Sequence, residues 1–322
     1  MQWNSIGDGP RIDDLRTAFL ERPPPFVYGV GVWFGPGVER PRLLVIVDSQ
    51  DVRVKPLPFS TGHSSPPFDE PTERQLVVGT VDEATARLRD AMGDWLSSSV
   101  VLPSDRPDPL LRLGSTLRDA GTGGRGTVGA ALESRAGPAI LTAGHVVSGL
   151  GAVMERRGPF PWQTKRAFGR VGLHSDPVAV GSTISSPGYD AAVINLDSGL
   201  DPDAYPVSPL LRTAAQLPST LPQPLPVRVF RGGLGRKVGM IVGSLFTGGT
   251  PWRQWRDCWI LTPGIAVQGD SGAAVVSTNG DLVGMLVGGA RQGGAGYAFH
   301  YLQDYSSTAA AILNPAGVGL PR

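Results

Sequence analysis

Glycine and proline interrupt this chain so often that long regular elements have little room to form. The 322 residues include 44 glycines and 30 prolines, nearly twice the usual share of about 12 % for the pair. Glycine loses much backbone entropy in a helix, and proline lacks the amide N–H and clashes with the preceding turn. Hydrophobic residues still make up 41 % of the chain, and no short repeat is present. The pattern excludes collagen-like and low-complexity proteins and favours short strands joined by many turns.

Charge and cysteine content narrow the classes of partner. The net charge of +1 argues against a nucleic-acid-binding protein or a polybasic membrane protein. Cys258 is the single cysteine, so we expect no intrachain disulfide, which is typical of proteins outside oxidising compartments. The first residues have neither the basic nor the apolar segment of a signal peptide, and no apolar run reaches the ~18 residues of a membrane span. We therefore expect a cytoplasmic protein without a membrane partner.

Residues 1–97 have the pattern of a small α+β domain. Apolar residues at helical spacing predict a helix within 11–20, and the capping-box pattern at 80–83 predicts the start of a second helix that ends near residue 96. Three apolar runs between them predict strands, at 27–34, 42–47 and 51–55. The segment 98–112 contains three prolines and a run of serines, and we interpret it as a linker.

The pattern changes over residues 113–322, which we predict to form a second, all-β domain. Short apolar runs bounded by glycine and proline predict its strands at 126–132, 139–142, 191–196, 227–230, 238–245, 258–261, 273–277 and 282–287. Near the end of the chain Leu302, Tyr305, Ala309 and Ile312 fall on one helical face, and Asn314-Pro315 ends that helix.

Three short segments in this region carry residues with the chemistry of nucleophilic catalysis. They are Thr142-Ala143-Gly144-His145, Asp190-Ala191-Ala192-Val193-Ile194 and Gly269-Asp270-Ser271-Gly272. A serine is a weak nucleophile at neutral pH unless an imidazole takes its proton, and the imidazole needs a carboxylate to fix its tautomer. Glycines before the serine allow a turn tight enough to direct backbone N–H groups at an oxyanion. Each segment alone is modest support, but together they supply every group that this chemistry requires.

The three segments resemble the signature motifs of trypsin-like, chymotrypsin-fold serine proteases, in particular the compact bacterial type without disulfides. The resemblance covers roughly residues 113–322 and implies two β-barrels with a catalytic site in the cleft between them. It implies His145 as general base, Asp190 as orienting carboxylate and Ser271 as nucleophile, with an oxyanion hole formed by the backbone N–H groups of Gly269 and Ser271. The segment 232–244 resembles the family's hairpin in the second barrel, and 296–299 its last strand before a C-terminal helix.

Other residues that could fill these roles lack the motif context. His63, His174 and His300 do not follow a Thr-Ala-Gly sequence, and Asp197 stands at the far end of its strand. Cys258 lacks a glycine-rich turn, and we interpret it as a small buried hydrophobic residue. The sequence departs from the family pattern at Ala273-Ala274, where Gly-Pro is usual in the family.

The resemblance places the substrate pocket at Ile265, with Val287, Gly288 and Gly289 as the opposite wall. An apolar residue at the pocket base predicts cleavage after apolar side chains rather than after Arg or Lys. The glycines predict an opening wide enough for a large group.

The resulting hypothesis is a serine endopeptidase that acts on protein or peptide substrates without a cofactor or metal. Residues 1–105 show no metal-ligand spacing and no phosphate-binding loop, and we expect a packing or regulatory module, with docking of an effector protein or inhibition of the protease as sharper alternatives. Two rival functions remain open at this point. The fold could serve as a non-catalytic peptide-binding protein, or the protease could cut only its own linker near Arg106 or Arg125.

Overall fold

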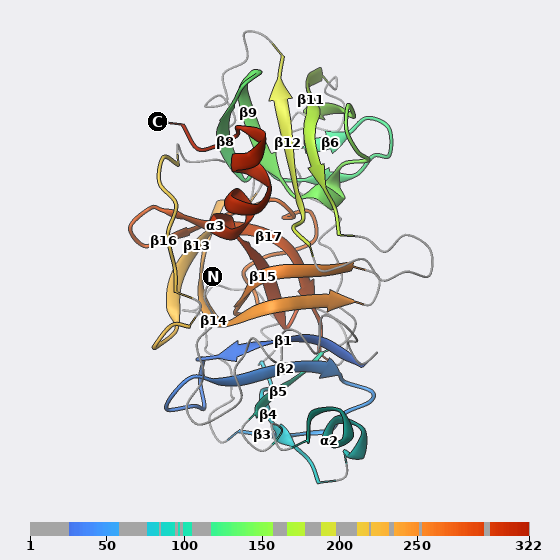
Figure 1. Ribbon diagram of the computed structural model, residues 1–322, viewed down its shortest axis with the longest axis vertical. Helices are drawn as coiled ribbons and strands as arrows, with labels where there is room; N and C mark the ends of the chain where they lie inside the picture. Colours follow the sequence, from blue (N-terminus) through green and yellow to red (C-terminus); the bar gives the residue numbers. More distant parts are fainter. Residues whose placement is uncertain are drawn as a thin grey trace.

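The computed structural model describes residues 26–57, 76–83, 85–93, 96, 99–104, 117–156, 166–177, 188–197, 211–218, 220–231, 235–250, 253–292 and 297–321. The helix predicted within 11–20 lies outside the described residues. Strands form three tiers along the long axis of the molecule (Figure 1). The mainly β fold, with two sheets and a C-terminal helical segment, is the one that the sequence predicts.

The first tier is a seven-stranded sheet that carries two of the three signature segments. Its order is β7 (Arg125–Gly126), β6 (Leu117–Asp119), β10 (Val153–Arg156), β11 (Arg166–Ser175), β12 (Ala191–Leu196), β9 (Gly137–Thr142) and β8 (Ala130–Ser134). β9 and β12 are neighbours, and Ala192 pairs with Thr142. Because β9 ends where the first segment begins and Asp190 immediately precedes β12, the sheet brings His145 and Asp190 to one edge.

The second tier is a closed ring of six strands. Its order is β13 (Leu225–Arg231), β16 (Ala274–Ser277), β17 (Leu282–Ala290), β18 (Phe299–Asp304), β15 (Arg253–Leu261) and β14 (Gly235–Thr250), and β14 pairs with β13 to complete the barrel. β13 and β14 pair antiparallel, and β14 covers the described part, 235–244, of the segment in which the resemblance places a hairpin. Ser271 lies just before β16, and its carbonyl accepts the backbone N–H of Thr127, which follows β7 of the first tier.

The third tier extends the same sheet into the N-terminal region. β1 (Val27–Trp33) pairs with the second half of β14 and is followed in the sheet by β2 (Arg42–Asp48), β5 (Ser99–Ser104), β4 (Gly79–Val81) and β3 (Val54–Pro56), with helix α2 (Ala86–Met92) beside them. Gly31 permits the close approach of β1 to β14, since a Cβ there would lie 1.9 Å from the Ser244 carbonyl oxygen. The barrel and the N-terminal strands are therefore one continuous sheet.

The hydrophobic core crosses the same junction. Val30 and Val32 of β1 are fully buried in one cluster with Ile241, Phe246 and Leu286 of the barrel. Burial of apolar side chains is the main stabilising term in folding, so the N-terminal strands and the barrel stabilise each other. The division into domains at 1–97 and 113–322 stays a prediction.

Several local elements differ from the sequence-based expectations. Ser99–Ser104, within the predicted linker, forms β5 and runs parallel to β2 as a mostly buried strand. The capping box at 80–83 was wrong, because Thr80 pairs with Lys55 between β3 and β4, and the helix begins later, at Ala86. Sequence patterns within a few residues carry no information about strand pairing between segments that are distant in the chain.

The C-terminal helical segment begins later than the apolar spacing predicts. Leu302 still belongs to β18, and Asp304 caps α3 (Tyr305–Thr308) by accepting a hydrogen bond from the Ser307 N–H. A wider turn (Ala309–Leu313) and a 3₁₀ turn (Asn314–Ala316) follow. The segment lies alongside the first tier, where Gly319 bridges to Glu133.

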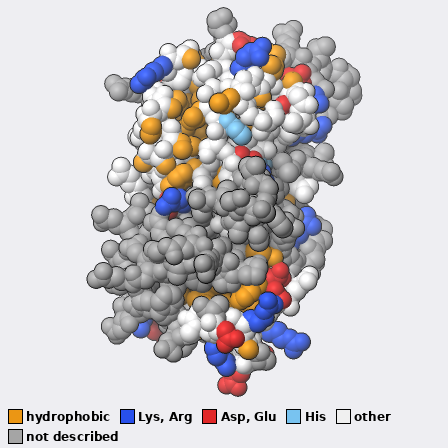
Figure 2. All heavy atoms as spheres, turned by 45° about the vertical axis from the view of Figure 1, so that its right-hand side comes forward, with side chains coloured by type: hydrophobic (Ala, Val, Ile, Leu, Met, Phe, Trp, Pro, Cys, Tyr) orange, Lys and Arg blue, Asp and Glu red, His pale blue; other side chains and the backbone are white. Residues whose placement is uncertain are grey.

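The surface carries charges of both signs. Figure 2 shows acidic and basic side chains interspersed over the N-terminal strands at the lower end of the molecule.

Among the helices that the structure describes, none is long and apolar enough to span a bilayer.

Candidate active site

The end of β9 places His145 at the edge of the first tier. The chain leaves β9 at Thr142 and forms a 3₁₀ turn over Gly144–Val146. Gly144 packs so tightly that a Cβ would lie 2.0 Å from the Ser175 carbonyl oxygen. The glycine of this signature segment is therefore required by the close approach of two backbones.

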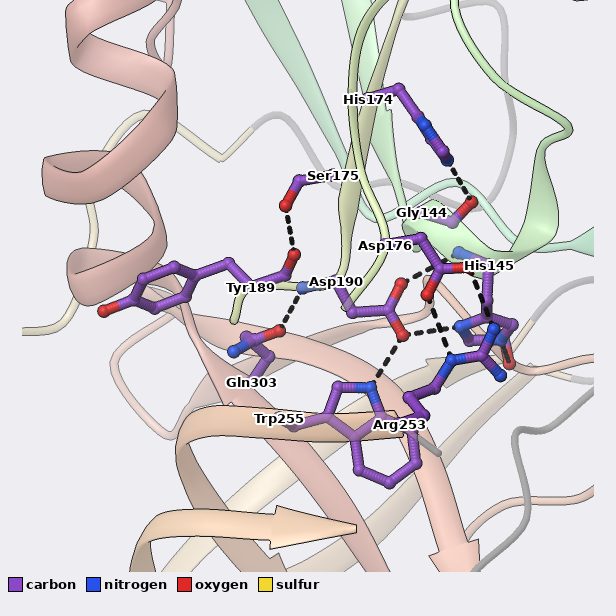
Figure 3. Close-up of polar contacts among 11 residues, drawn as sticks. Gly144, His145, His174, Ser175, Asp176, Tyr189, Asp190, Arg253, Trp255 and Gln303 are labelled. Carbon is purple, nitrogen blue, oxygen red and sulfur yellow. Dashed lines mark hydrogen bonds and ion pairs between the residues drawn. The ribbon is translucent and has the colours of Figure 1, made fainter. Parts of the chain in front are cut away.

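Asp190 lies immediately before β12 and is fully buried, with several donors around its carboxylate. Oδ1 accepts the backbone N–H of His145 at 2.9 Å. Oδ2 lies 2.6 Å from His145 Nδ1 and accepts the indole N–H of Trp255 at 2.8 Å (Figure 3). The backbone N–H of Asp190 donates to the side-chain oxygen of Gln303 at 2.6 Å. These contacts fix the carboxylate and direct it at the imidazole.

These contacts also determine the protonation of the carboxylate. Burial alone would raise the pKa of Asp190, but the His145 and Arg253 charges and the indole N–H together hold that pKa below its ordinary value. Asp190 is therefore ionised at neutral pH, as an orienting carboxylate must be.

Ser271 lies in a tight turn held against the first tier. Gly269 and Gly272 have φ of +99° and +90°, a conformation that side chains disfavour. Thr127, which follows β7, holds this turn: its backbone N–H donates to the Ser271 carbonyl at 2.7 Å and its hydroxyl to the Gly269 carbonyl at 3.0 Å. The turn thus presents the serine side chain, which is fully buried, to His145 at the edge of the first tier.

The three signature side chains meet in one hydrogen-bonded line. The distance from His145 Nε2 to Ser271 Oγ is 2.8 Å, and the opposite ring nitrogen is the one that contacts Asp190. This geometry permits the imidazole to accept the serine proton while the carboxylate stabilises the resulting imidazolium. The oxyanion hole assigned to Gly269 and Ser271 stays a prediction.

Asp270, beside the serine, is buried and paired with a residue that the sequence analysis did not identify. Arg231, at the end of β13, donates from Nε to Asp270 Oδ2 at 2.7 Å, and the backbone N–H of Val267 donates to the same oxygen at 2.9 Å. Burial raises the pKa of Asp270, although both donors act against that rise. The signal for this pair was indirect: a carboxylate beside a buried serine needs a cation.

A second ion pair lies next to the His145 imidazole and connects the first tier to the second. Arg253, at the start of β15, donates from Nε and Nη2 to the two carboxylate oxygens of Asp176, at 3.0 and 2.9 Å (Figure 3). Burial and the nearby Asp190 charge raise the pKa of Asp176, and Arg253 opposes them. A bidentate pair of this kind fixes the relative position of its two strands.

The predicted pocket residues are all described, and they lie in or beside the barrel core. Ile265 is 1 % exposed and belongs to the core cluster of the barrel. A Cβ at Gly288 would lie 2.6 Å from the indole of Trp255, and one at Gly289 would lie 2.5 Å from the ring of Tyr297. The two glycines therefore allow aromatic rings to pack directly against β17. Val287 is fully buried in the same strand. The role of these residues in substrate binding stays a prediction.

His300 and Cys258, the two other candidates in the barrel, are both fully buried. Neither ring nitrogen of His300 has a hydrogen-bond partner among the described residues. Burial, and then the Arg231 charge, lower the pKa of His300 to about 3. Burial raises the pKa of the Cys258 thiol, which opposes formation of a nucleophilic thiolate. The described residues contain no cluster of metal-ligating side chains.

No family model and no curated protein sequence matches the chain. Solved structures do match. The chain is similar to bacterial chymotrypsin-fold serine proteases over about 62 % of its length. One is a Nocardiopsis protease (NAPase), with 19 % identity, 94 % of that chain covered, 62 % of this one and a TM-score of 0.43. A second is a glutamic-acid-specific serine protease that uses a histidine triad in substrate binding. It has 15 % identity and a TM-score of 0.47, and the match covers 98 % of that chain and 65 % of this one. A third is a Cellulomonas bogoriensis chymotrypsin, with 19 % identity and a TM-score of 0.43, and the match covers 96 % of that chain and 65 % of this one.

Sequence identities of 15–19 % do not establish that this chain shares the activity of these proteases. The geometry of His145, Asp190 and Ser271 is the observation that bears on function.

Proposed function

We propose that the protein is a serine endopeptidase with Ser271 as nucleophile, His145 as general base and Asp190 as orienting carboxylate. The observation that carries this proposal is the continuous line from Asp190 Oδ2 to His145 Nδ1, at 2.6 Å, and from His145 Nε2 to Ser271 Oγ, at 2.8 Å. Each distance lies within the range at which a proton is transferred along a hydrogen bond.

The reaction proceeds in two stages. Ser271 Oγ attacks the carbonyl carbon of the scissile peptide bond while His145 Nε2 takes the hydroxyl proton. His145 then gives that proton to the leaving amine, and an acyl-enzyme remains on Ser271. A water molecule, deprotonated by the same imidazole, then attacks the acyl carbon. The ester bond to Ser271 Oγ breaks, His145 gives the proton to that oxygen, and the acid product is released. The backbone N–H groups of Gly269 and Ser271 stabilise the negatively charged oxygen in both stages.

Covalent labelling of the serine tests the proposal most directly. A fluorophosphonate probe should label the wild-type protein and should not label the Ser271→Ala variant. A His145→Ala variant should be labelled at least about a hundredfold more slowly, because the serine then lacks its base. Absence of Ser271-dependent labelling in folded protein contradicts the proposal and favours a non-catalytic peptide-binding protein.

Substrate choice is the finer part of the proposal. Ile265 predicts cleavage after apolar side chains, and a peptide library that places Phe, Leu, Met, Arg, Lys or Glu before the scissile bond measures the preference. Cleavage only after Arg or Lys contradicts it. The self-processing alternative, with a cut near Arg106 or Arg125, predicts that the intact mass of the wild-type chain disappears on incubation while the Ser271→Ala chain stays intact.

A further inference from the structure

Strand β17 contacts several parts of the proposed active site before it reaches the N-terminal region. Its Leu286 carbonyl accepts the backbone N–H of Gly272, next to the nucleophile, at 2.8 Å. Two residues later, Gly288 packs against the indole of Trp255, whose N–H holds Asp190. These two contacts fix β17 at the proposed active site as far as Gly288, so a displacement of the strand beyond Gly288 falls on Gly289 and the residues that follow it.

The residue just beyond this strand is bound to the N-terminal region. Gln292 accepts the backbone N–H of Val77 at 3.1 Å and donates to the Val77 carbonyl at 3.0 Å. The same amide nitrogen donates to the Pro103 carbonyl at 2.5 Å. Val77 precedes β4, and Pro103 lies in β5. One side chain thus joins two segments that are 215 and 189 residues distant in the sequence.

Gln292 also lies in the connection between the two strands of a hairpin. β17 ends at Ala290, and the backbone N–H of Ala298 donates to the Ala290 carbonyl at 2.8 Å as the chain returns toward β18. The rings of Tyr297 and His300 lie against Gly289 in this hairpin. A restraint on Gln292 is therefore a restraint on the segment that the resemblance assigns to substrate binding.

We propose that Gln292 is a positioning residue through which the N-terminal strands hold the β17–β18 hairpin in the geometry that binds a peptide. The proposal rests on the proposed endopeptidase activity. It gives residues 26–104 a role in catalysis: they support the substrate-binding wall, and Ser271 and His145 do not depend on them directly. It also differs from an inhibitory prodomain, whose removal would raise activity.

The amide group accounts for the choice of residue at this position. Its oxygen accepts one backbone N–H and its nitrogen donates to two backbone carbonyls, which no other side chain of this size can do at once. Gln292→Ala removes all three bonds. Gln292→Glu keeps the shape and the acceptor for the Val77 N–H, but it lacks both donors and places a carboxylate against two carbonyl oxygens. Both variants should release the hairpin.

Steady-state kinetics with a fluorogenic peptide tests the proposal. In both Gln292 variants KM should rise about fivefold or more, while kcat and the rate of fluorophosphonate labelling of Ser271 stay within about twofold of wild type. Tyr28→Phe is the matched control, because it removes the hydrogen bond that the Tyr28 hydroxyl donates to Asp48 Oδ2, at 2.5 Å, within the N-terminal strands. This control should lower the melting temperature without changing KM.

Two results would overturn the proposal. One is a wild-type KM in both Gln292 variants. The other is a fall in labelling rate and kcat, with a rise in KM, that accompanies a lower melting temperature and occurs equally in Tyr28→Phe. That result would identify a merely structural role.

A readout that does not need activity separates this proposal from the endopeptidase itself. In the Ser271→Ala background, Gln292→Ala should accelerate hydrogen exchange at the amides of Val77 and Ala298. If the wild-type protein is not labelled by fluorophosphonate, the endopeptidase is contradicted, and the exchange rates still decide whether Gln292 restrains the hairpin. Unchanged exchange at both amides overturns that restraint.

Discussion

Trp255 donates its indole N–H to Asp190 Oδ2 at 2.8 Å, so a residue of the barrel positions the carboxylate of the other tier. The indole is 1 % exposed, and it packs between Gly288 and the ring of Tyr301. Because this N–H and the His145 ring share one carboxylate oxygen, loss of the indole donor would leave Asp190 less firmly oriented.

Trp255→Phe should therefore lower kcat/KM by about tenfold, since one hydrogen bond to a charged group contributes about 1.5–3 kcal/mol. The loss should fall mainly on kcat, because the imidazole is held less well in the transition state. Trp259→Phe is the matched control: it lies in the same strand and also donates to a buried carboxylate, that of Asp304, at 3.1 Å. An equal loss of kcat in both variants would contradict a specific role for Trp255.

Arg231 and Asp270 predict a second measurable effect, this time on stability. Removing one member of a buried ion pair leaves an uncompensated charge and costs about 3–5 kcal/mol. Arg231→Met should lower the free energy of unfolding by about that amount and should distort the turn that carries Ser271. The double variant Arg231→Met/Asp270→Asn should recover part of the loss. Urea denaturation of all three proteins measures it, and a double variant no more stable than Arg231→Met would contradict the pairing as its cause.

The sequence identified the groups of the candidate site because their local context is distinctive. His145, Asp190 and Ser271 each lie in a short segment whose glycines or strand boundary are visible without the fold. The structure brings all three together. The approximate places of β13, β16 and β17 in the barrel were also predictable, since glycine and proline bound their apolar runs. β14 (Gly235–Thr250) and β15 (Arg253–Leu261) extend well beyond the predicted runs at 238–245 and 258–261.

The supporting residues were not predictable in the same way. Trp255, Gln303 and Arg231 reach the site from strands that only the tertiary pairing brings close, and no local pattern marks them. The same holds for β5, whose Ser99–Ser104 sequence contains a proline and a serine at each end, as is typical of a linker, yet pairs in parallel with β2. Long-range pairing decided each of these elements.

His300 predicts a dependence of stability on pH. Its pKa in the folded protein is about 3, whereas the ordinary value is 6.5. The unfolded chain therefore binds the proton first, and the stability contributed by neutral His300 is complete above pH 6.5 and is lost as pH falls toward 3. The full shift corresponds to a loss on the order of 5 kcal/mol.

His300→Phe should remove this part of the acid sensitivity while keeping the aromatic volume. The free energy of unfolding of the variant should fall less between about pH 7 and about pH 4 than that of the wild type, because all other titrating groups are shared. Chemical denaturation at both pH values measures the difference. Identical pH slopes in the two proteins would show that His300 is not buried as a neutral group.

Gly31 predicts whether the N-terminal strands and the barrel unfold together. A Cβ at this position would lie 1.9 Å from the Ser244 carbonyl oxygen and 2.6 Å from Leu245 Cα, and backbone atoms cannot move aside as a flexible side chain would. Gly31→Ala should force β1 away from β14 and lower the free energy of unfolding by about 3 kcal/mol or more. Gly319→Ala is the control, since a Cβ there meets nothing within 4 Å.

Calorimetry should show one unfolding transition in the wild type and one transition at a lower temperature in Gly31→Ala, because β1 shares both a sheet and a buried cluster with the barrel. The activity toward a fluorogenic peptide should be lost over the same temperature range. Two transitions, of which only the lower responds to Gly31→Ala while the upper coincides with loss of activity, would instead identify the N-terminal region as a separately folding domain, as the composition of the chain predicts.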